Sequence, residues 1–377
     1  MKSEWKRLSL GEITENVIDC RGKTPKKLGG DWSESGYRAL SAKNIKTGRI
    51  VQLDTIRYIN DEMYKRWMKE EVQRGDILIT SEAPFGQIFF WDSEEKIVLS
   101  QRLFCVRIKP EYDARFIYYY MTTPAFQSEL EGRATGTTVI GLRQPELMKC
   151  VIRCPRIQEQ KAIATVLSAI DAKIVVNEKL NDNLEEQSKV IFDKLFPNIS
   201  NGSYTVGNYI TPKRGKNLLS KNAVQGNVPV VAGGLVPSVY HNTSNTKAPV
   251  LAISASGANA GYVSLWNIPI WASDSSYIDS SMTNNVYFWY ALLKKRQKEI
   301  FDAQTGSAQP HIYPQHIAGM PIKELEVAKI QEFNAMVTPI FEKIGKNLKE
   351  NTQLETLRDI LLPKLMSGEI DISAIQF

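Results

Sequence analysis

Two long stretches of the chain carry apolar residues at steps that alternate between four and three residues. This 3.5-residue period is typical of a helix that buries one stripe against a partner helix. The first stripe consists of Ile163, Leu167, Ile170, Ile174, Asn177, Asn181, Leu184, Ser188, Ile191 and Leu195. The second consists of Phe333, Val337, Ile340, Ile344, Asn347, Asn351, Leu354, Arg358, Leu361 and Leu365. We therefore predict two long coiled-coil helices, the first from about Gln158 to Phe196.

The two stripes match position by position at a spacing of 170 residues, and both contain two Asn at the same places. This agreement indicates an internal duplication, in which a globular region followed by a long helix occurs twice. In an antiparallel pair, Asn177 and Asn181 would meet Asn347 and Asn351 near the middle. A shifted Asn would face an apolar side chain, so these residues are expected to fix the register.

Proline is expected to disturb the second helix. Pro339 lacks an N–H and suits the first position of a helix capped by Thr338, which predicts a break or kink there. Pro363 is expected to bend or loosen the last turns.

Short strand-like runs fill both globular regions and are bounded by Gly, Pro and Asp-Ser turns. In the first region they are residues 37–40, 50–53, 76–80, 87–91, 97–99, 103–108 and 151–154. In the second they are residues 228–232, 250–254, 262–265 and 268–272. Helices are predicted at Ala114–Met121, continuing after Pro124 to about Leu130, and at Val286–Ile300. The expected fold class is α+β, with two mixed, β-rich domains separated by two long antiparallel helices.

Charge is distributed unevenly along the chain. Residues 1–155 carry 25 Lys and Arg against 21 Asp and Glu, and residues 204–325 carry 10 against 5. The helical segments 156–203 and 326–377 are slightly acidic. A basic excess confined to the globular regions favours a polyanionic ligand, although a solvated basic face without a ligand would look the same.

Composition limits the protein class further. No stretch approaches the roughly 20 apolar residues of a membrane span, and the first residues lack the apolar core of a signal peptide, so a cytoplasmic protein without membrane contact is expected. Cys20, Cys105, Cys150 and Cys154 suit a reducing compartment. Cys150 and Cys154 have no second ligand pair, which argues against zinc.

Two basic, glycine-containing loops are the first candidate binding elements. Lys and Arg on such loops can approach phosphates without steric hindrance, whereas a flexible surface loop is the alternative interpretation. The candidates in the first region are Arg21, Lys23, Lys26 and Lys27, together with Lys43 and Asn44. Those in the second region are Lys213, Arg214, Lys216 and Lys221.

Two Gly- and Thr-rich loops, again 170 residues apart, are the second candidates. Gln and Arg form bidentate hydrogen bonds with adenine and guanine, so different side chains here would give different base preferences. A turn packed on a helix start is the alternative interpretation. The candidates are Arg133, Thr135, Thr137, Thr138 and Arg143 in the first loop, and Thr305, Ser307, Gln309 and His311 in the second.

No pattern of residues indicates catalysis. The chain has no GxxxxGK[ST] motif, and the segment SASGANAG lacks the helix that a dinucleotide-binding loop needs. No two prolines are adjacent, which excludes the Asn/Asp-Pro-Pro-aromatic motif of amino-methyltransferases. His241, His311 and His316 have no partner at metal-ligand spacing. No cofactor or metal is expected.

The chain resembles the specificity subunits of type I restriction–modification systems over essentially its whole length. The similar segments are Trp5 with Gly11-Glu12, residues 75–79 (GDILI), residues 155–160 (PRIQEQ) and, most specifically, residues 361–370 (LLPKLMSGEI). The second helix entry departs from the pattern, with Phe333 where the first copy has Gln160, so its start is left open.

This resemblance implies target-recognition domains at residues 1–155 and 204–325, each binding one half of a split site in double-stranded DNA. Long helices at 156–203 and 326–377 would fix the spacer between the halves. The implied partners are two methyltransferase subunits and two ATP-driven endonuclease subunits, which would supply the S-adenosylmethionine and ATP chemistry. Independently, two similar basic regions related by a pseudo-twofold axis suit two half-sites on one duplex.

Two other functions remain open from the sequence. An architectural coiled-coil adaptor that binds only proteins would show no sequence-selective DNA binding. A nuclease or methyltransferase with an unrecognised site would cut or methylate DNA without partners.

Overall fold

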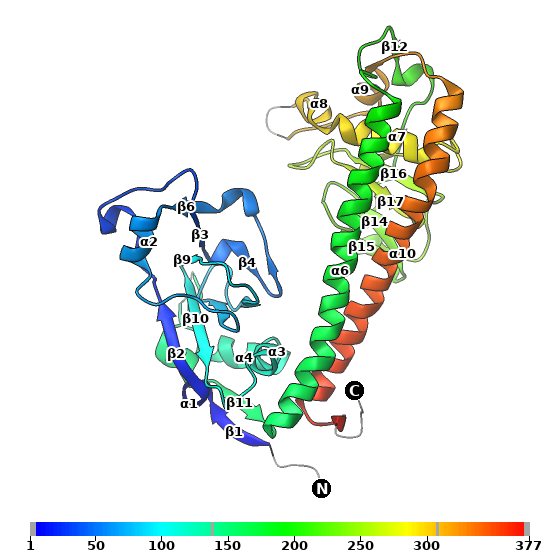
Figure 1. Cartoon of the computed structure of the whole chain (residues 1–377). Helices are drawn as coiled ribbons and strands as arrows, with labels where there is room; N and C mark the ends of the chain where they lie inside the picture. Colours follow the sequence, from blue (N-terminus) through cyan, green and yellow to red (C-terminus); the bar gives the residue numbers. More distant parts are fainter. Residues whose placement is uncertain (1–4, 137–138, 307–308, 373–377) are drawn as a thin grey trace. The chain divides into compact units, whose positions relative to one another are not determined.

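The computed structural model describes residues 5–136, 139–306 and 309–372 (Figure 1). The chain divides into two compact units. The first unit contains residues 1–172 and 354–377, and the second contains residues 173–353. The boundary cuts both long helices, α6 (Ile157–Leu195) and α10 (Val327–Met366), so each unit holds part of both.

The described residues of the first unit form three sheets and a small hairpin. A four-stranded sheet has the order β2 (Thr14–Asp19), β10 (Leu103–Ile108), β7 (Ile77–Thr80) and β8 (Ile88–Phe90). A three-stranded sheet contains β6 (Arg57–Ile59), β3 (Tyr37–Leu40) and β9 (Val98–Leu99). The remaining pairs are β1 (Lys6–Ser9) with β11 (Val151–Cys154), and β4 (Ile45–Lys46) with β5 (Arg49–Ile50).

The four-stranded sheet of the first unit is buried on both faces. Successive residues of a strand point to opposite faces, so Phe104 and Leu103 enter two different hydrophobic clusters. One cluster includes Leu167 of α6 and Leu365 of α10, whereas the other packs around Trp67. The helices of this unit, besides the two long ones, are α1 (Leu10–Ile13), α2 (Asp61–Trp67), α3 (Ala114–Met121), α4 (Pro124–Arg133) and α5 (Gln144–Met148).

The second unit has the same plan. Its four-stranded sheet has the order β13 (Lys213–Arg214), β19 (Ser275–Asp279), β16 (Val250–Ser254) and β17 (Val263–Trp266). Its three-stranded sheet contains β15 (Val239–His241), β14 (Val228–Val231) and β18 (Trp271–Ala272), and β12 (Tyr204–Thr205) pairs with β20 (Pro321–Ile322). The shorter helices are α7 (Val286–Lys295), α8 (Gln297–Asp302) and α9 (Pro314–Ala318).

The shared topology confirms the predicted duplication and extends it from the helices to the sheets. In both three-stranded sheets the middle strand pairs antiparallel with one neighbour and parallel with the other. The α+β fold class is therefore confirmed, with a long helix after each β-rich region.

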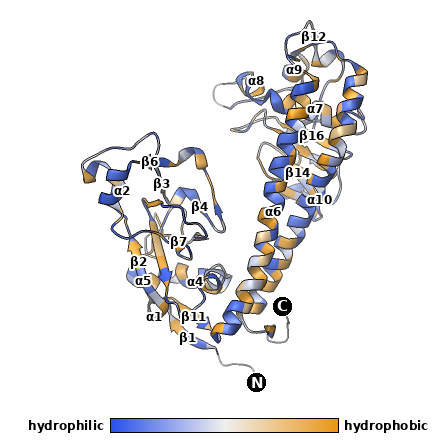
Figure 2. Cartoon of the chain, in the orientation of Figure 1, coloured by the Kyte–Doolittle hydropathy of each residue, from blue (hydrophilic) through white to orange (hydrophobic). Residues whose placement is uncertain are grey.

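The two stripes face each other, as predicted. Both helices alternate hydrophobic and hydrophilic residues along their length (Figure 2). In the second unit Asn177 Nδ2 donates to Asn351 Oδ1 at 2.8 Å, and Asn347 Nδ2 donates to Asn181 Oδ1 at 2.8 Å. All four Asn are buried. Asn177 also donates to Glu350 at 2.9 Å, and this hydrogen bond lowers the pKa of the Glu350 carboxyl.

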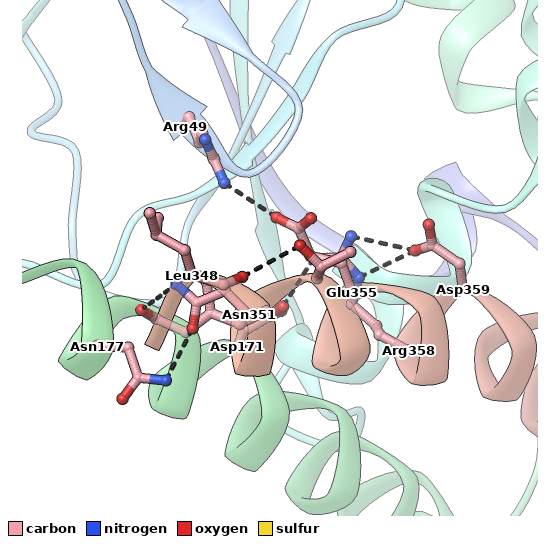
Figure 3. A network of polar contacts seen from close by, with 10 residues as sticks. Arg49, Asp171, Asn177, Leu348, Asn351, Glu355, Arg358 and Asp359 are labelled. Carbon is pink, nitrogen blue, oxygen red and sulfur yellow. Dashed lines mark hydrogen bonds and ion pairs between the residues drawn. The ribbon is translucent and has the colours of Figure 1, made fainter. Parts of the chain in front are cut away.

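Polar contacts join the helices to the first unit's globular part (Figure 3). Asp171 of α6 accepts a hydrogen bond from the Tyr119 hydroxyl at 2.6 Å and an ion-paired hydrogen bond from Arg358 of α10 at 2.9 Å. Arg49 of β5 reaches Glu355 of α10 at 3.3 Å. In the second unit aromatic rings take this role, because Phe288 of α7 packs against Phe192 of α6 at 5.9 Å and edge to face against Phe333 of α10 at 6.4 Å between ring centroids.

The predicted break at Thr338-Pro339 is wrong, because α10 runs without interruption from Val327 to Met366. A proline inside a helix costs roughly 3 kcal/mol, but burying Val337 and Phe341 contributes about 1.5–3 kcal/mol each. Both side chains are fully buried in the second unit's core. Pro339 itself is exposed, so water can bond the carbonyl that loses its partner.

The predicted helix Val286–Ile300 is also interrupted, because α7 ends at Lys295 and α8 begins at Gln297. The residue between them, Arg296, is buried and donates to the Pro321 carbonyl at 2.7 Å. In the described part of the chain, no helix is both long and apolar enough to cross a bilayer.

The Asn pairs generate a stability prediction. Replacing Asn181 by Leu leaves Asn347 without its acceptor, and a buried amide that loses its partner costs about 1–3 kcal/mol. Asn181→Leu should therefore lower the free energy of unfolding by that amount, measured by urea denaturation. The double variant Asn181→Leu/Asn347→Leu should regain most of it, because both amides are then gone. A double variant as unstable as the sum of the single variants would contradict the pairing.

Candidate nucleic-acid interface

Arg21 joins the two candidate loops of the first unit. It follows β2, and its guanidinium forms hydrogen bonds with both carboxylate oxygens of Asp19 at 2.8–3.1 Å. It also lies over the Phe104 ring at 4.0 Å and donates to the Leu142 carbonyl at 3.4 Å. The basic loop and the Gly/Thr loop, about 120 residues apart in sequence, therefore meet in space.

The Gly/Thr loop is closed by a pair of backbone hydrogen bonds between Thr135 and Gly141, each 2.9 Å. Gly136 adopts a φ of 122°, which side chains rarely permit. Arg133 is held by Glu129 at 3.0 Å and lies 3.8 Å from Glu146. The candidates Thr137 and Thr138 lie outside the described residues.

Both loops line one open groove with a volume of about 670 Å³. Four basic side chains and two acidic ones face it, so its charge is positive. The predicted residues that it brings together are Arg21, Lys27, Thr135 and Arg143. A second groove of about 410 Å³ includes Lys43.

The remaining candidates of the first unit differ in their freedom to bind a ligand. Lys26 and Lys43 are exposed, whereas Lys23 is half-buried and donates to the Trp67 carbonyl at 2.7 Å. Lys27 is exposed and donates to the Gly22 carbonyl at 2.8 Å.

Asn44 is 1% exposed and donates to Thr55 Oγ1 at 3.1 Å and to the Gln52 carbonyl at 3.2 Å. Its amide is used within the protein, so the geometry argues against an external ligand at this residue.

In the second unit, the carboxylate of Asp274 and the hydroxyl of Ser256 connect the candidate residues Arg214 and His311. Lys213 and Arg214 belong to strand β13 and not to a loop, which corrects the prediction. Strand pairing with β19 explains this, because Lys213 and Arg214 pair with Tyr277 and Ser276. Arg214 forms an ion pair with Asp274 at 2.6 Å, and Asp274 accepts a hydrogen bond from Ser256.

Ser256 in turn is bridged to His311 of the Gly/Thr loop. Thr305 and His311 form the same closing pair of backbone hydrogen bonds as Thr135 and Gly141, at 2.8 and 3.0 Å. The 170-residue repeat therefore holds at the level of loop geometry. Lys216, Lys221 and Gln309 are exposed, and Ser307 lies outside the described residues.

Sequence patterns missed several groove residues, above all Gln101 and Arg102 in the turn before β10 and Glu82 after β7. Arg102 has a φ of 66° and pairs with Glu82 at 2.9 Å. Gln101-Arg102 lies between two strand-like runs, which could have indicated an exposed turn. The positive φ of Arg102 could not be predicted, because it has no characteristic sequence pattern.

Within the described ranges, no group of three or more His, Cys, Asp or Glu is placed to hold a metal ion. All four cysteines are buried. Burial raises the pKa of every one of these thiols, and it raises the pKa of Cys150 and Cys154 to about 12.

These thiols should be unreactive in the folded protein, because the thiolate is the nucleophile and burial disfavours it. At pH 8 Ellman's reagent is expected to label no cysteine until denaturant is added, after which all four react. Rapid labelling of any one thiol in the native state would contradict this buried arrangement.

Comparison with known proteins agrees with the duplicated α+β architecture. The family model for the type I restriction modification DNA specificity domain matches residues 2–186. The MjaIX specificity subunit of a type I restriction enzyme from Methanocaldococcus jannaschii is 26% identical over 360 residues, covering 85% of this chain and 83% of that protein. A putative type I specificity subunit from Mycoplasma pneumoniae is 26% identical over 279 residues, covering 68% of this chain and 73% of that one.

A solved structure extends the comparison to the whole fold. The crystal structure of the type I restriction-modification S subunit from M. genitalium covers 96% of both chains, with a TM-score of 0.61 and 20% identity. At this identity the likeness shows a shared fold, and the family model and the curated relatives supply the family. The chain belongs to the specificity subunits of type I restriction–modification systems, as its sequence motifs had predicted.

Proposed function

We propose that this chain is the DNA-recognition subunit of a type I complex, in which each β-rich domain binds one half of a bipartite site on double-stranded DNA. The recognition domains would be residues 1–155 and 204–325. One observation carries the proposal. In both units a basic side chain at or just after the end of the first strand of the four-stranded sheet is linked to the Gly/Thr loop. Arg21 contacts the loop directly, whereas Arg214 is linked to it through Asp274 and Ser256.

Different side chains on this common frame favour two different half-sites. The first unit lines its groove with Arg21, Arg102 and Arg143, which suit phosphates and guanine. The second unit offers Gln309, His311 and the Arg214–Asp274 pair. Such unlike surfaces on like folds would recognise an asymmetric sequence.

The helices, residues 156–203 and 326–377, would set the number of base pairs between the half-sites. The buried Asn pairs support this role, because they allow one register between α6 and α10.

The same helices would dock two methyltransferase subunits. In the second unit, Val176, Leu180 and Leu348 lie on these helices and are 37–57% exposed, although they are large and apolar. Large apolar side chains that stay exposed on a helix are candidates for contact with a partner protein. Two endonuclease subunits would join for cleavage, and methylation and ATP chemistry would belong to the partners, leaving this chain without a catalytic site.

A binding and activity experiment tests the proposal. The chain, purified with the methyltransferase subunits of its host, should retard one bipartite duplex selectively and methylate it, and methylated adenines in the host genome should define the same site. An adaptor that binds only proteins would give no sequence-selective shift. An unrecognised enzyme would methylate or cut DNA without partners. Either result would refute the proposed function.

Removal of two basic side chains of the second unit should weaken DNA binding by that complex. If Arg214 and Lys216 contact phosphates, replacing both by Ala should reduce the slope of log affinity against log salt by about 1 to 2. Lys189→Ala, which removes an exposed Lys paired with Glu186 on α6, serves as the charge control and should leave the slope unchanged. An unchanged slope in the double variant would exclude phosphate contact.

Longer helices should lengthen the spacer. One heptad inserted at matched positions in α6 and α10 adds about 10.5 Å at 1.5 Å per residue, which corresponds to about three base pairs at 3.4 Å each. Methylome sequencing should then show both half-sites unchanged and the unread spacer longer. A recognised site with the original spacer would argue against a ruler function of the helices.

A further inference from the structure

We propose that Gln101 and Arg102, in the turn between β9 and β10, contact base edges in the half-site bound by the first unit. This inference rests on the proposed function and names the residues that would give this domain its sequence preference. Both residues line the 670 Å³ groove and the 410 Å³ groove, so they form the ridge that separates the two.

The ridge suits a duplex groove, in which base edges lie between two phosphate strands about 12 Å apart. Cationic side chains lie on both sides of it. Lys27 and Arg143 line the larger groove, and Lys43 and Arg57 line the smaller. Each phosphate strand would therefore meet basic groups while the ridge faces the bases.

The backbone of the ridge is fixed from two sides. The Gln101 carbonyl accepts a hydrogen bond from Ala42 N at 3.1 Å, and the Arg102 carbonyl accepts one from Ser81 N at 2.8 Å. Arg102 also holds a φ of 66°, which is uncommon for residues other than glycine and is typical of functional sites. A side chain on a fixed backbone loses less freedom when it binds.

The two side chains, by contrast, are available to a ligand. Both residues are exposed, and within the described residues the Gln101 amide makes no hydrogen bond. Arg102 pairs with Glu82, which is itself partly exposed at 35%. This surface pair is weak and can orient the guanidinium without preventing a new contact. Arg and Gln are the side chains that form bidentate pairs with guanine and adenine.

The second unit carries a different residue at the same backbone position. Its turn between β18 and β19 is anchored equivalently, because Ala255 N donates to the Asp274 carbonyl at 3.1 Å. Arg102 therefore corresponds to Asp274, and its partner Glu82 corresponds to Ser256, whose hydroxyl donates to Asp274. Opposite charges at equivalent backbone positions would give the two units different base preferences, and hence two different half-sites.

The test uses the complete complex with its methyltransferase subunits and duplexes that carry single base-pair changes in the site found by methylome sequencing. Arg102→Lys keeps the charge but removes the bidentate fork. We expect its DNA affinity and salt slope to stay near wild type, while discrimination at one base pair of one half-site falls about tenfold or more. Gln101→Ala should relax a neighbouring position of the same half-site.

Two further variants serve as controls. Arg102→Asn retains a residue that tolerates the left-handed backbone, so loss of specificity in it cannot be attributed to a distorted turn. Arg66→Ala removes an exposed Arg that is also paired with a carboxylate, Glu62 at 2.5 Å, but that lines neither groove. It should leave every base preference unchanged.

The outcomes separate the two proposals. If the wild-type complex methylates no bipartite site, the proposed function itself fails. If it does, but Arg102→Lys, Arg102→Asn and Gln101→Ala keep the wild-type preference at every position, only the assignment of the ridge is overturned. Equal relaxation of both half-sites, or a uniform loss of affinity with unchanged base preference, would overturn it as well.

Discussion

The arrangement of this protein depends on four buried amides. Asn177 with Asn351 and Asn181 with Asn347 replace apolar contacts in the middle of a helix pair. A hydrogen bond between neutral groups contributes only about 0.5–1.5 kcal/mol net, whereas a buried amide without a partner costs about 1–3 kcal/mol. The pairs therefore add little to stability in the correct register but penalise every other one. Apolar contacts on either side of the amides supply most of the attraction between the helices.

Because of the duplication, the two units share one backbone fold but carry different side chains at their candidate binding surfaces. The sheets, the closed Gly/Thr loops and the anchored turns recur in both units. The side chains that the frame presents do not recur, as Arg102 and Asp274 illustrate. Backbone hydrogen bonds hold the frame, so side chains at the grooves can differ without disturbing the fold. Because the backbone determines the fold and the groove side chains determine recognition, members of a family of specificity subunits can change their target sequence without changing the fold.

The sequence predicted well whatever depends on long periodic patterns. The stripes located α6 within a residue at each end and identified the Asn that meet. Where packing opposes a local rule, prediction failed, as at Pro339. The stripe indicated that Val337 is buried, but it could not show that this burial, together with that of Phe341, outweighs the cost of a proline inside the helix. Short strands such as Lys213–Arg214 are defined by their partner and have no pattern of their own. Among the candidate residues, the sequence found the loops, but it could not show that Asn44 is buried or that Gln101 and Arg102 form a ridge.

The two units are not equivalent along the chain. The second is built from one continuous segment, 173–353, but the first needs residues from both ends. Leu365, Met366 and Ile372 are buried in the same cluster as Leu10 and Ile13. During synthesis on the ribosome, all residues of the second unit are therefore made before residues 354–372, which complete the hydrophobic core of the first unit. The domain made first is the one completed last, and loss of the carboxyl-terminal residues would expose the interior of the amino-terminal domain.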